Sequence, residues 1–185
     1  MIEHIIHLTR GQSTVVDTVD YLYIAPLTWH AIWDESGKRF YAAHSERIYD
    51  NLTGRYVGNR LIRLHRIIME HVLGRPLLSS EQIDHIDGNA LNNRRSNLRP
   101  CSATQNRQNK RKPPFTRGKI VSSAYKGVSW DRHTSKWKVQ IRANRRYFYI
   151  GLFVDELKAA AAYDDAAKRL HGDFARTNAE YRKGG

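Results

Sequence analysis

A stretch of eighteen residues, IDHIDGNALNNRRSNLRP at positions 83–100, is too polar to form a buried element. It holds four asparagines, two aspartates, one histidine and three arginines. Its side chains that can line a core are Ile83, Ile86, Ala90, Leu91 and Leu98. The stretch is therefore either a solvated loop or a site that needs these polar groups.

The whole chain has 185 residues, enough for one domain or two small ones. No apolar run approaches the roughly 20 residues that span a bilayer, and the charged N-terminus is a poor signal peptide. We therefore expect a soluble, intracellular protein without a membrane partner. Cys101 is the only cysteine, which excludes disulfides and cysteine-based zinc sites. A metal site would use histidine, carboxylate, amide and water, a set that suits Mg²⁺ or Mn²⁺, although imidazole also suits zinc.

The net charge of +13 is concentrated in the second half of the chain. Residues 1–82 are neutral overall, residues 83–112 carry a net charge of +5, and residues 113–185 carry +8. Such segmental positive charge is typical of a protein that binds a polyanion, most often nucleic acid. The alternative is that the positive charge serves only to keep the protein soluble.

Residues 5–60 are rich in β-branched and aromatic residues, which predicts short strands. The segment 14–33 within this region is expected to be strand as well. The polar turn around Ser36–Gly37 predicts a hairpin. Residues 60–73 have apolar side chains at helical spacing, so this segment should begin as a strand and turn helical before Gly74.

Residues 98–102 predict a short strand that follows the polar stretch. Ser102 and Gln105 form a capping-box pattern, so a helix should start at about Ala103. Residues 107–126 contain seven basic residues, no acidic residue and two consecutive prolines. This composition is typical of a linker that can lie along phosphates.

From about residue 123 the pattern predicts a small α+β module of three strands and one helix. The expected strands are residues 124–131, 136–143 and 146–153, and the expected helix is 155–171, with Asp155 as its N-cap and Gly172 as its terminating glycine.

Alternation along the second of these strands directs Trp137, Val139 and Ile141 toward the helix, and its basic and polar side chains outward. Tyr147 and Tyr149 share one face of the third strand. A basic, aromatic sheet face of this kind can enter a major groove. The alternative is a solvated β face.

Three segments of the first half resemble the HNH endonuclease family with its ββα-metal motif, in particular the homing-endonuclease branch of phage genomes and introns. They are LHR at 64–66, IDHIDGNALNNRRSNLRP at 83–100 and TQNRQN at 104–109. The resemblance covers residues 60–112 closely. It implies an α+β fold in which an N-terminal β-rich region leads into a ββα-metal unit, with its core at about 80–112, in an HNH endonuclease domain spanning residues 1–112.

The motif consists of Asp84 and His85, then Asn97 twelve residues after the histidine and Asn106 nine residues further on. By position, the resemblance implies that His85 is the general base and that Asn97 pins the catalytic loop. It also implies that Asp84 and Asn106 bind one divalent ion, Mg²⁺ or Mn²⁺. An imidazole with an ordinary pKa near 6.5 can accept a proton near neutral pH, and a hard cation prefers such oxygen ligands.

Other polar residues near the motif have more than one interpretation. Asn89, Asn92 and Asn93 most simply hold the loop through local hydrogen bonds, and Asn93 is also a candidate supporting residue of the site. His65 either supports the site or is structural, and we interpret His71 as structural.

The second half resembles the Apetala-two/ethylene-response-factor (ERF) type of DNA-binding domain over about residues 124–178. The resemblance is carried by YKGVSW, KWKVQIRA, RYFYIGLF and AAAAYDD. It implies a three-stranded antiparallel sheet packed on one α-helix in a domain spanning residues 123–185, after a basic linker at 113–122. Lys126 and Ser129 depart from the family's pattern, which usually has arginine there.

Together these features predict a metal-dependent, site-specific DNA endonuclease of the homing type. It would nick or cut double-stranded DNA by phosphodiester hydrolysis, as a monomer or weak dimer on DNA, in the cytoplasm of a bacterial host of the encoding phage. The competing function is a non-catalytic, sequence-specific DNA-binding regulator with a degenerate nuclease fold. The residues expected to contact DNA are Arg66, Arg94, Arg95, Arg107, Lys110, Arg111, Lys126, Arg132, Lys136, Lys138, Gln140, Arg142, Tyr147 and Tyr149.

Overall fold

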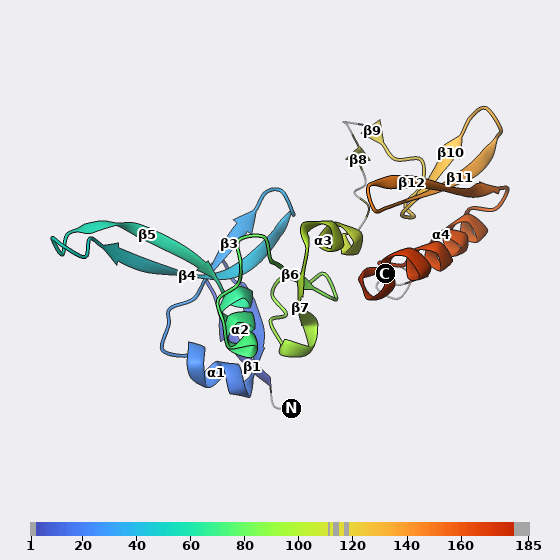
Figure 1. Cartoon of the computed structure of the whole chain (residues 1–185). Coiled ribbons are helices and arrows are strands. Elements are labelled where there is room, and N and C mark those ends of the chain that lie inside the picture. The colour runs from blue at the N-terminus through green and yellow to red at the C-terminus, as the bar shows by residue number, and fades with distance from the viewer. Residues whose placement is uncertain (1–2, 111, 113–114, 117–118, 180–185) are drawn as a thin grey trace. The chain divides into compact units, whose positions relative to one another are not determined.

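The computed structural model describes residues 3–110, 112, 115–116 and 119–179, in two compact units, Met1–Ala103 and Thr104–Gly185. The protein is mixed α/β, with several small sheets and, in the described part of the chain, four α-helices (Figure 1). None of these helices has the length and apolarity needed to cross a membrane.

The first unit combines three small antiparallel sheets with two helices. The sheets are β1 (Glu3–His7) with β2 (Ser13–Asp17), then β3 (His30–Asp34) with β4 (Arg39–Tyr49) and β5 (Tyr56–Arg63), and finally β6 (Gln82–His85) with β7 (Leu98–Cys101). The helices are α1 (Thr18–Ile24) and α2 (Leu64–Leu73), and a 3₁₀ turn, η1 (Arg95–Asn97), precedes β7.

One hydrophobic core joins these elements. Val16 of β2, Ile24 of α1, and Leu64 and Ile68 of α2 are fully buried in it, and β6 and β7 contribute side chains to the same cluster. Burial of an aliphatic side chain of this size stabilises the fold by about 1.5–3 kcal/mol. The core therefore fixes the end of β6, and the loop that follows it, beside β2 and α2.

The strand-to-helix transition expected in residues 60–73 is confirmed. β5 ends at Arg63, and α2 runs from Leu64 to the left-handed residue Gly74, whose φ is 64°. The hairpin expected around Ser36–Gly37 is also confirmed, because β3 pairs with β4 across that turn.

The expectation of strands throughout residues 14–33 is wrong for Thr18–Ile24, which forms α1. Its buried positions, Asp20 and Ile24, are four residues apart and so share one helical face. The Asp20 carboxylate is drawn inside because it pairs with Arg95, with Nη2 and Oδ1 2.8 Å apart. Tertiary contacts thus override the β propensity of the segment.

In the second unit, β10 (Val128–Asp131), β11 (Lys136–Ala143) and β12 (Arg146–Phe153) form an antiparallel sheet that packs on α4 (Glu156–His171). Val139 and Ile141 are buried with alanines of the helix, as strand alternation predicted. The Asp155 carboxylate accepts a hydrogen bond from the Lys158 backbone N–H (2.7 Å), so the predicted N-cap is confirmed. The helix ends at Gly172, whose φ is 54°, within the short 3₁₀ turn η2 (Gly172–Phe174).

A predicted helix, α3 (Ala103–Asn109), begins where the first unit ends. The chain therefore has the expected order of strand, loop, strand and helix, while the ββα-metal arrangement stays a prediction. The short strands β8 (Phe115–Thr116) and β9 (Lys119–Ile120) pair with each other in the expected linker. The rest of the expected linker lies partly outside the described residues, as does Arg111.

Candidate active site

The loop between β6 and β7 is held together by its own asparagine and aspartate side chains. Asn97 Oδ1 accepts a hydrogen bond from the Asp87 backbone N–H (3.0 Å), and Asn97 Nδ2 donates to Asp87 Oδ1 (3.0 Å) and to the Asn92 carbonyl (2.7 Å). Asn92 donates in turn to Asp87 Oδ2 (2.7 Å). Gly88 takes a φ of 80°, which a side chain would make costly. These are contacts that a loop-pinning role for Asn97 requires.

The same loop is hydrogen-bonded to β2. The Asn93 backbone N–H donates to the Val15 carbonyl (2.8 Å), and the Val15 N–H donates to the Leu91 carbonyl (3.0 Å). Thr14 Oγ1 adds a bond to the Leu91 carbonyl (2.7 Å). The loop is therefore fixed from both ends and from the side, by residues that no sequence pattern had paired with it.

His85, the last residue of β6, lies buried against this loop, with its Nε2 3.2 Å from Asn93 Oδ1. Asn93 is only 1% exposed, and its Nδ2 donates to Thr14 Oγ1 (2.8 Å), which turns Oδ1 toward the histidine. Because an amide oxygen only accepts hydrogen bonds, the proton of the neutral imidazole is on Nε2. The lone pair is then on Nδ1, which is the atom able to take up a proton.

The surroundings of His85 favour its neutral form. Burial lowers its pKa from the ordinary value of 6.5, while the hydrogen bond to Asn93 and the negative charges of Asp87 and Asp84 act weakly in the opposite direction. A histidine that stays neutral at neutral pH is suited to act as a general base.

Two aromatic side chains complete the surroundings of His85. The rings of His65 on α2 and His85 have centroids 5.2 Å apart and are almost perpendicular, at 89°. The Tyr41 ring on β4 lies 5.5 Å from His65 and 6.2 Å from His85. Burial, followed by repulsion from His85, lowers the pKa of His65 well below 6.5. The structure thus brings His65 to the site as a neutral packing group, which favours its interpretation as a supporting residue.

Asp84 is also buried, beside His85. Arg99, its cross-strand partner on β7, donates to Asp84 Oδ2 from Nε (2.9 Å) and from Nη2 (2.7 Å). Among the described residues, no group of three or more histidine, cysteine, aspartate or glutamate side chains could hold a metal ion. A single carboxylate nevertheless fits Mg²⁺, which keeps several water ligands and binds substrate phosphates. Such an ion would compete with Arg99 for Asp84.

The other residue expected to bind metal, Asn106, is half-buried in α3 and belongs to the second unit. Its role as a ligand stays a prediction. Nearby on α3, Arg107 Nη2 lies 3.4 Å from Thr104 Oγ1, and Lys110 directly after the helix is exposed.

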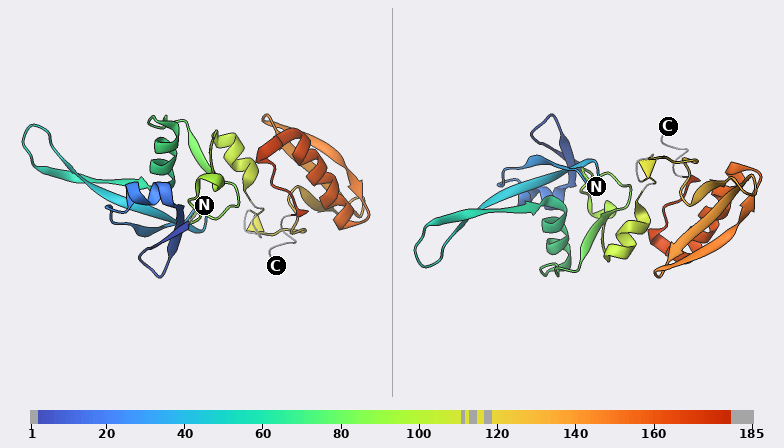
Figure 2. Two further views of the ribbon diagram at one scale, coloured as in Figure 1. Left: turned by 90° about the horizontal axis from the view of Figure 1, so that it is seen from below. Right: turned by 90° about the horizontal axis from the view of Figure 1, so that it is seen from above.

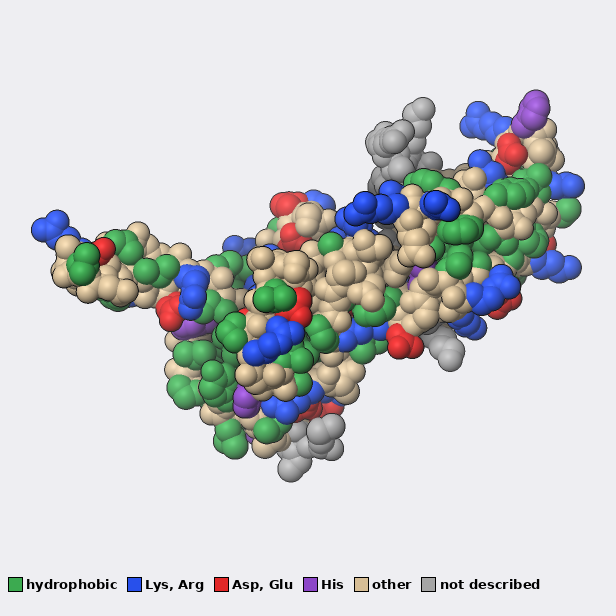
Figure 3. All heavy atoms as spheres, in the orientation of Figure 1, with side chains coloured by type: hydrophobic (Ala, Val, Ile, Leu, Met, Phe, Trp, Pro, Cys, Tyr) green, Lys and Arg blue, Asp and Glu red, His purple; other side chains and the backbone are tan. Residues whose placement is uncertain are grey.

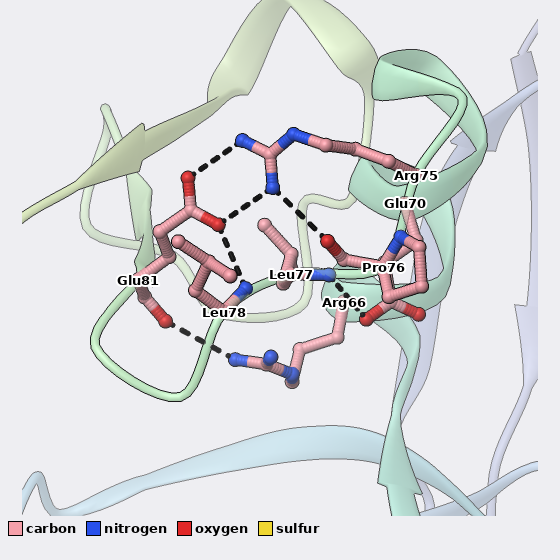
Figure 4. Close-up of polar contacts among 7 residues, drawn as sticks. All are labelled: Arg66, Glu70, Arg75, Pro76, Leu77, Leu78 and Glu81. Carbon is pink, nitrogen blue, oxygen red and sulfur yellow. Dashed lines mark hydrogen bonds and ion pairs between the residues drawn. The ribbon is translucent and has the colours of Figure 1, made fainter.

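Arg66, which we expected to contact DNA, is engaged in the loop that follows α2 (Figure 4). Its Nη1 donates to the Glu81 carbonyl (3.3 Å). The Glu81 carboxylate is held by two bonds from Arg75, both 2.8 Å, and by the Leu78 backbone N–H (2.8 Å). The bond from Arg75 is the main reason why the pKa of Glu81 is lowered to about 2. Arg66 therefore has a structural contact of its own.

Arg94 and Arg95 also have partners within the first unit. Arg94 forms an exposed ion pair with Glu3. Arg95 donates from Nε and Nη2 to the two carboxylate oxygens of Asp20, at 2.8 Å each, and the Asp20 side chain is only 1% exposed. The structure therefore gives Arg95 a role in folding, whether or not it also contacts DNA.

The outer face of the sheet in the second unit is polar and aromatic. Gln140 of β11 is paired with Tyr149 of β12, and Arg142 is paired with Tyr147. The two tyrosines are 60% and 71% exposed, and Arg142 Cζ lies 5.4 Å from the centre of the Tyr147 ring. Basic side chains surround this unit on the face drawn in Figure 3.

The remaining predicted DNA contacts of this unit differ in exposure. Arg132 and Lys136 are exposed, whereas Lys138 is half-buried. Lys126 donates from Nζ to the Gln108 carbonyl and is half-buried as well. The exposed members of the set are therefore the better placed to meet a ligand.

Comparison with known proteins adds independent information. A family model described as HNH endonuclease matches residues 63–108. Protein 3.8 of Escherichia phage T7 is 32% identical over 114 residues, covering 62% of this chain and 88% of that protein. The "Uncharacterized HNH endonuclease L560" of Acanthamoeba polyphaga mimivirus is 33% identical over 117 residues, covering 63% and 57% of the two chains. APETALA2-like protein 2 of Oryza sativa subsp. indica is 40% identical over 68 residues, covering 36% of this chain and 15% of that protein.

Proposed function

We propose that this chain, which has an HNH endonuclease domain and is similar to a mimivirus HNH endonuclease, is a metal-dependent, site-specific endonuclease of the homing type. Its proposed substrate is double-stranded DNA, whose phosphodiester bonds it hydrolyses. The observation that carries the proposal is the buried pair of His85 and Asn93, with Nε2 and Oδ1 3.2 Å apart, because it presents a neutral imidazole with its lone pair on Nδ1.

In the proposed reaction, Nδ1 of His85 takes a proton from a water molecule. The water oxygen forms a bond to phosphorus, and the bond between phosphorus and the 3′ oxygen breaks with its electron pair. The 3′ oxygen then takes a proton from solvent, which leaves a 3′ hydroxyl and a 5′ phosphate. Asn93 holds the imidazole in place, Asn97 holds the loop, and His65 keeps the site packed.

HNH nucleases generally use a divalent metal ion. Here Asp84 and Asn106 would hold Mg²⁺ or Mn²⁺, and the bound ion would supply positive charge for the phosphate and for the leaving oxygen. Arg99 has to share or release Asp84 Oδ2 for this purpose.

The second unit is proposed to supply DNA affinity and site choice through the outer face of its sheet. Its basic and aromatic side chains suit a major groove, and its similarity to APETALA2-like protein 2 supports the ERF-type interpretation. With one candidate catalytic histidine of this kind in the chain, we propose nicking by a monomer. Similarity to a protein of phage T7 supports a phage-encoded enzyme that acts inside a bacterial host.

A specific observation favours the competing function, a DNA-binding regulator without catalysis. Two bonds from Arg99 already occupy Asp84 Oδ2, as expected if this carboxylate has only a structural role. If the protein is an enzyme, nicking of DNA depends on His85. If it is a regulator, the wild type binds DNA without nicking it.

A supercoiled-plasmid assay with Mg²⁺ or Mn²⁺ tests the two functions. We expect the wild type to produce open-circular DNA and His85→Ala to lose at least about a hundredfold in rate, the lower range for a missing general base. DNA binding should be unchanged in this variant. Binding without nicking by the wild type would favour the regulator. Strand-specific end labels would then distinguish nicks from staggered double-strand cuts.

A further inference from the structure

The strands β4 and β5 continue as a two-stranded ribbon beyond the rest of the first unit (Figure 2). We call residues 44–63 of this ribbon the arm. Between Ser45 and Leu61, every side chain except that of Asp50 is exposed. The exposed side chains lie on both faces of both strands. Leu52 at the tip is 97% exposed. A two-stranded ribbon without packing is at best marginally stable in water, so the arm is suited to a partner that covers it.

The two faces of the arm differ in charge. Side chains an even number of positions apart on a strand share a face. The pair Arg47 and Asn59 therefore lies on the same face as the pair Ala43 and Arg63. On the opposite face, Arg60 is neutralised by Glu46 in an ion pair of 2.6 Å. One face therefore carries net positive charge, whereas the other is balanced.

The other carboxylate of the arm is engaged in the turn at its tip. Asp50 Oδ1 accepts bonds from the backbone N–H groups of Leu52 (3.1 Å) and Thr53 (2.6 Å). It therefore does not compensate Arg47, for which the described residues show no ion-pair partner. The charged face is left with the cations of Arg47 and Arg63.

This charged face is continuous with the candidate active site. Arg63 Cζ lies 4.8 Å from the centre of the Tyr41 ring, and the Tyr41 ring lies 6.2 Å from that of His85. A duplex whose scissile phosphate reaches His85 would therefore meet Arg63 first and Arg47 farther along the arm.

We propose that the arm binds the double-stranded DNA flanking the scissile bond, with Arg47 and Arg63 toward the phosphates. The inference rests on the proposed function, which places DNA at His85. A two-stranded ribbon fits the width of a major groove. From Tyr41 to Tyr49 the strand advances by about 26 Å at roughly 3.3 Å per residue. At about 3.4 Å per base pair, the stretch from Tyr41 to the far end of the arm covers roughly eight base pairs on one side of the cut.

Salt-dependent binding tests the proposal without cleavage. In the His85→Ala protein, the affinity for a fluorescein-labelled duplex is measured with and without Arg47→Ala. Loss of one phosphate contact should lower the magnitude of the slope of log affinity against log salt concentration by about 0.9. The affinity lost through Arg47→Ala should therefore be about eightfold larger at 0.1 M salt than at 1 M salt. The matched control is the charge-neutral double variant Glu46→Ala/Arg60→Ala on the opposite face, which should bind as the parent does. Equal behaviour of Arg47→Ala and this control would overturn the proposal.

A shortened arm supplies a second measurement. Residues 47–59 are replaced by Asn-Gly, which leaves β3 and the first part of β4, with its buried Ala42 and Ala43, in place. On a duplex bearing a nick site mapped with the wild type, hydroxyl-radical protection should shrink by roughly three base pairs on one side only, because the strand loses Arg47–Tyr49, about 10 Å at roughly 3.3 Å per residue. A full footprint would overturn the proposal, and so would conversion of a dimer to a monomer with unchanged DNA affinity.

The outcomes for the arm and for the enzyme are distinguishable. If the wild type does not nick DNA in any condition while Arg47→Ala still lowers the salt slope, the proposed function fails and DNA binding by the arm is retained. If the wild type nicks and Arg47→Ala leaves the salt slope unchanged, the arm proposal fails and the enzyme is retained.

Discussion

The Nε2 atom of His85 lies 3.2 Å from the Oδ1 atom of Asn93, and both side chains are buried. Asn93→Ala removes this acceptor and frees the imidazole to rotate or change tautomer. Since an unsatisfied buried donor costs about 1–3 kcal/mol, we expect the plasmid-nicking rate to fall by about ten- to a hundredfold, with DNA affinity unchanged. The control is Asn89→Ala, because Asn89 is exposed and bonds the Leu91 N–H within the loop. An equal loss in both variants would contradict a positioning role for Asn93.

The pH dependence of nicking follows from the burial of His85. Burial lowers the pKa of this imidazole below 6.5, so the neutral, base-competent form persists as the pH falls through 6.5. We expect the acid limb of the single-turnover rate to lie below pH 6.5. In Asn93→Asp a carboxylate would favour the imidazolium form, so the limb should move to higher pH. Rates measured across the acid-to-neutral range test both expectations, and an acid limb above pH 6.5 in the wild type would contradict the first.

Much of this site could be predicted from spacing along the chain. Asp84 and His85 end a strand, Asn97 precedes the next one, and a helix follows directly, as the polar pattern indicated. The bond from His85 to Asn93 was not predicted, since asparagine is common in loops that bind nothing. The orientation of Asn93 depends on Thr14, which lies 79 positions earlier in the chain. No local pattern in the sequence records such a partner.

The same limit explains the errors in the fold. Residues 18–24 have strand-like composition, but a buried carboxylate on Asp20 requires a cation, and Arg95 supplies it from a segment 75 positions away. The strands of the arm were expected from composition. That the arm carries unpacked side chains on both faces depends on where the core ends, which strand alternation does not reveal.

The stability of the first unit should depend on pH through His65. Burial holds the pKa of His65 well below 6.5, whereas the unfolded chain has the ordinary value. The unfolded state therefore binds more protons in mild acid, so stability is full above about pH 6.5 and is lost as the pH falls toward the folded pKa. In His65→Gln the melting temperature should change less over this range. His133→Gln in the exposed turn of the second unit is the control, and an identical slope in His65→Gln and the wild type would refute the assignment.

Arg95 and Arg94 are neighbours with opposite expected importance for folding. Arg95→Ala leaves the buried Asp20 carboxylate without its main cation, so we expect a loss of about 3–5 kcal/mol in the free energy of unfolding. Arg94→Ala breaks a more exposed pair with Glu3 and should cost about 0–1 kcal/mol. Denaturant titration measures both. If Arg95 has only this structural role, the folded fraction of Arg95→Ala should bind DNA with an unchanged salt slope. Similar stability losses in Arg95→Ala and Arg94→Ala would contradict the difference expected between the two arginines.

Arg142 and Tyr147 should act as a unit on the outer face of the second sheet. They are cross-strand partners, and Arg142 Cζ lies 5.4 Å from the centre of the tyrosine ring. If the ring aims the guanidinium at a guanine edge, Arg142→Ala should weaken binding to the mapped site by about 1–3 kcal/mol. Tyr147→Ala should lose part of this binding free energy. In the double variant it should add little to the loss caused by Arg142→Ala, because the effects of coupled residues are not additive. Tyr147→Phe keeps the ring and should bind normally, while Lys136→Ala should change the salt slope alone. Additive losses in a double-mutant cycle would show that the two side chains act separately.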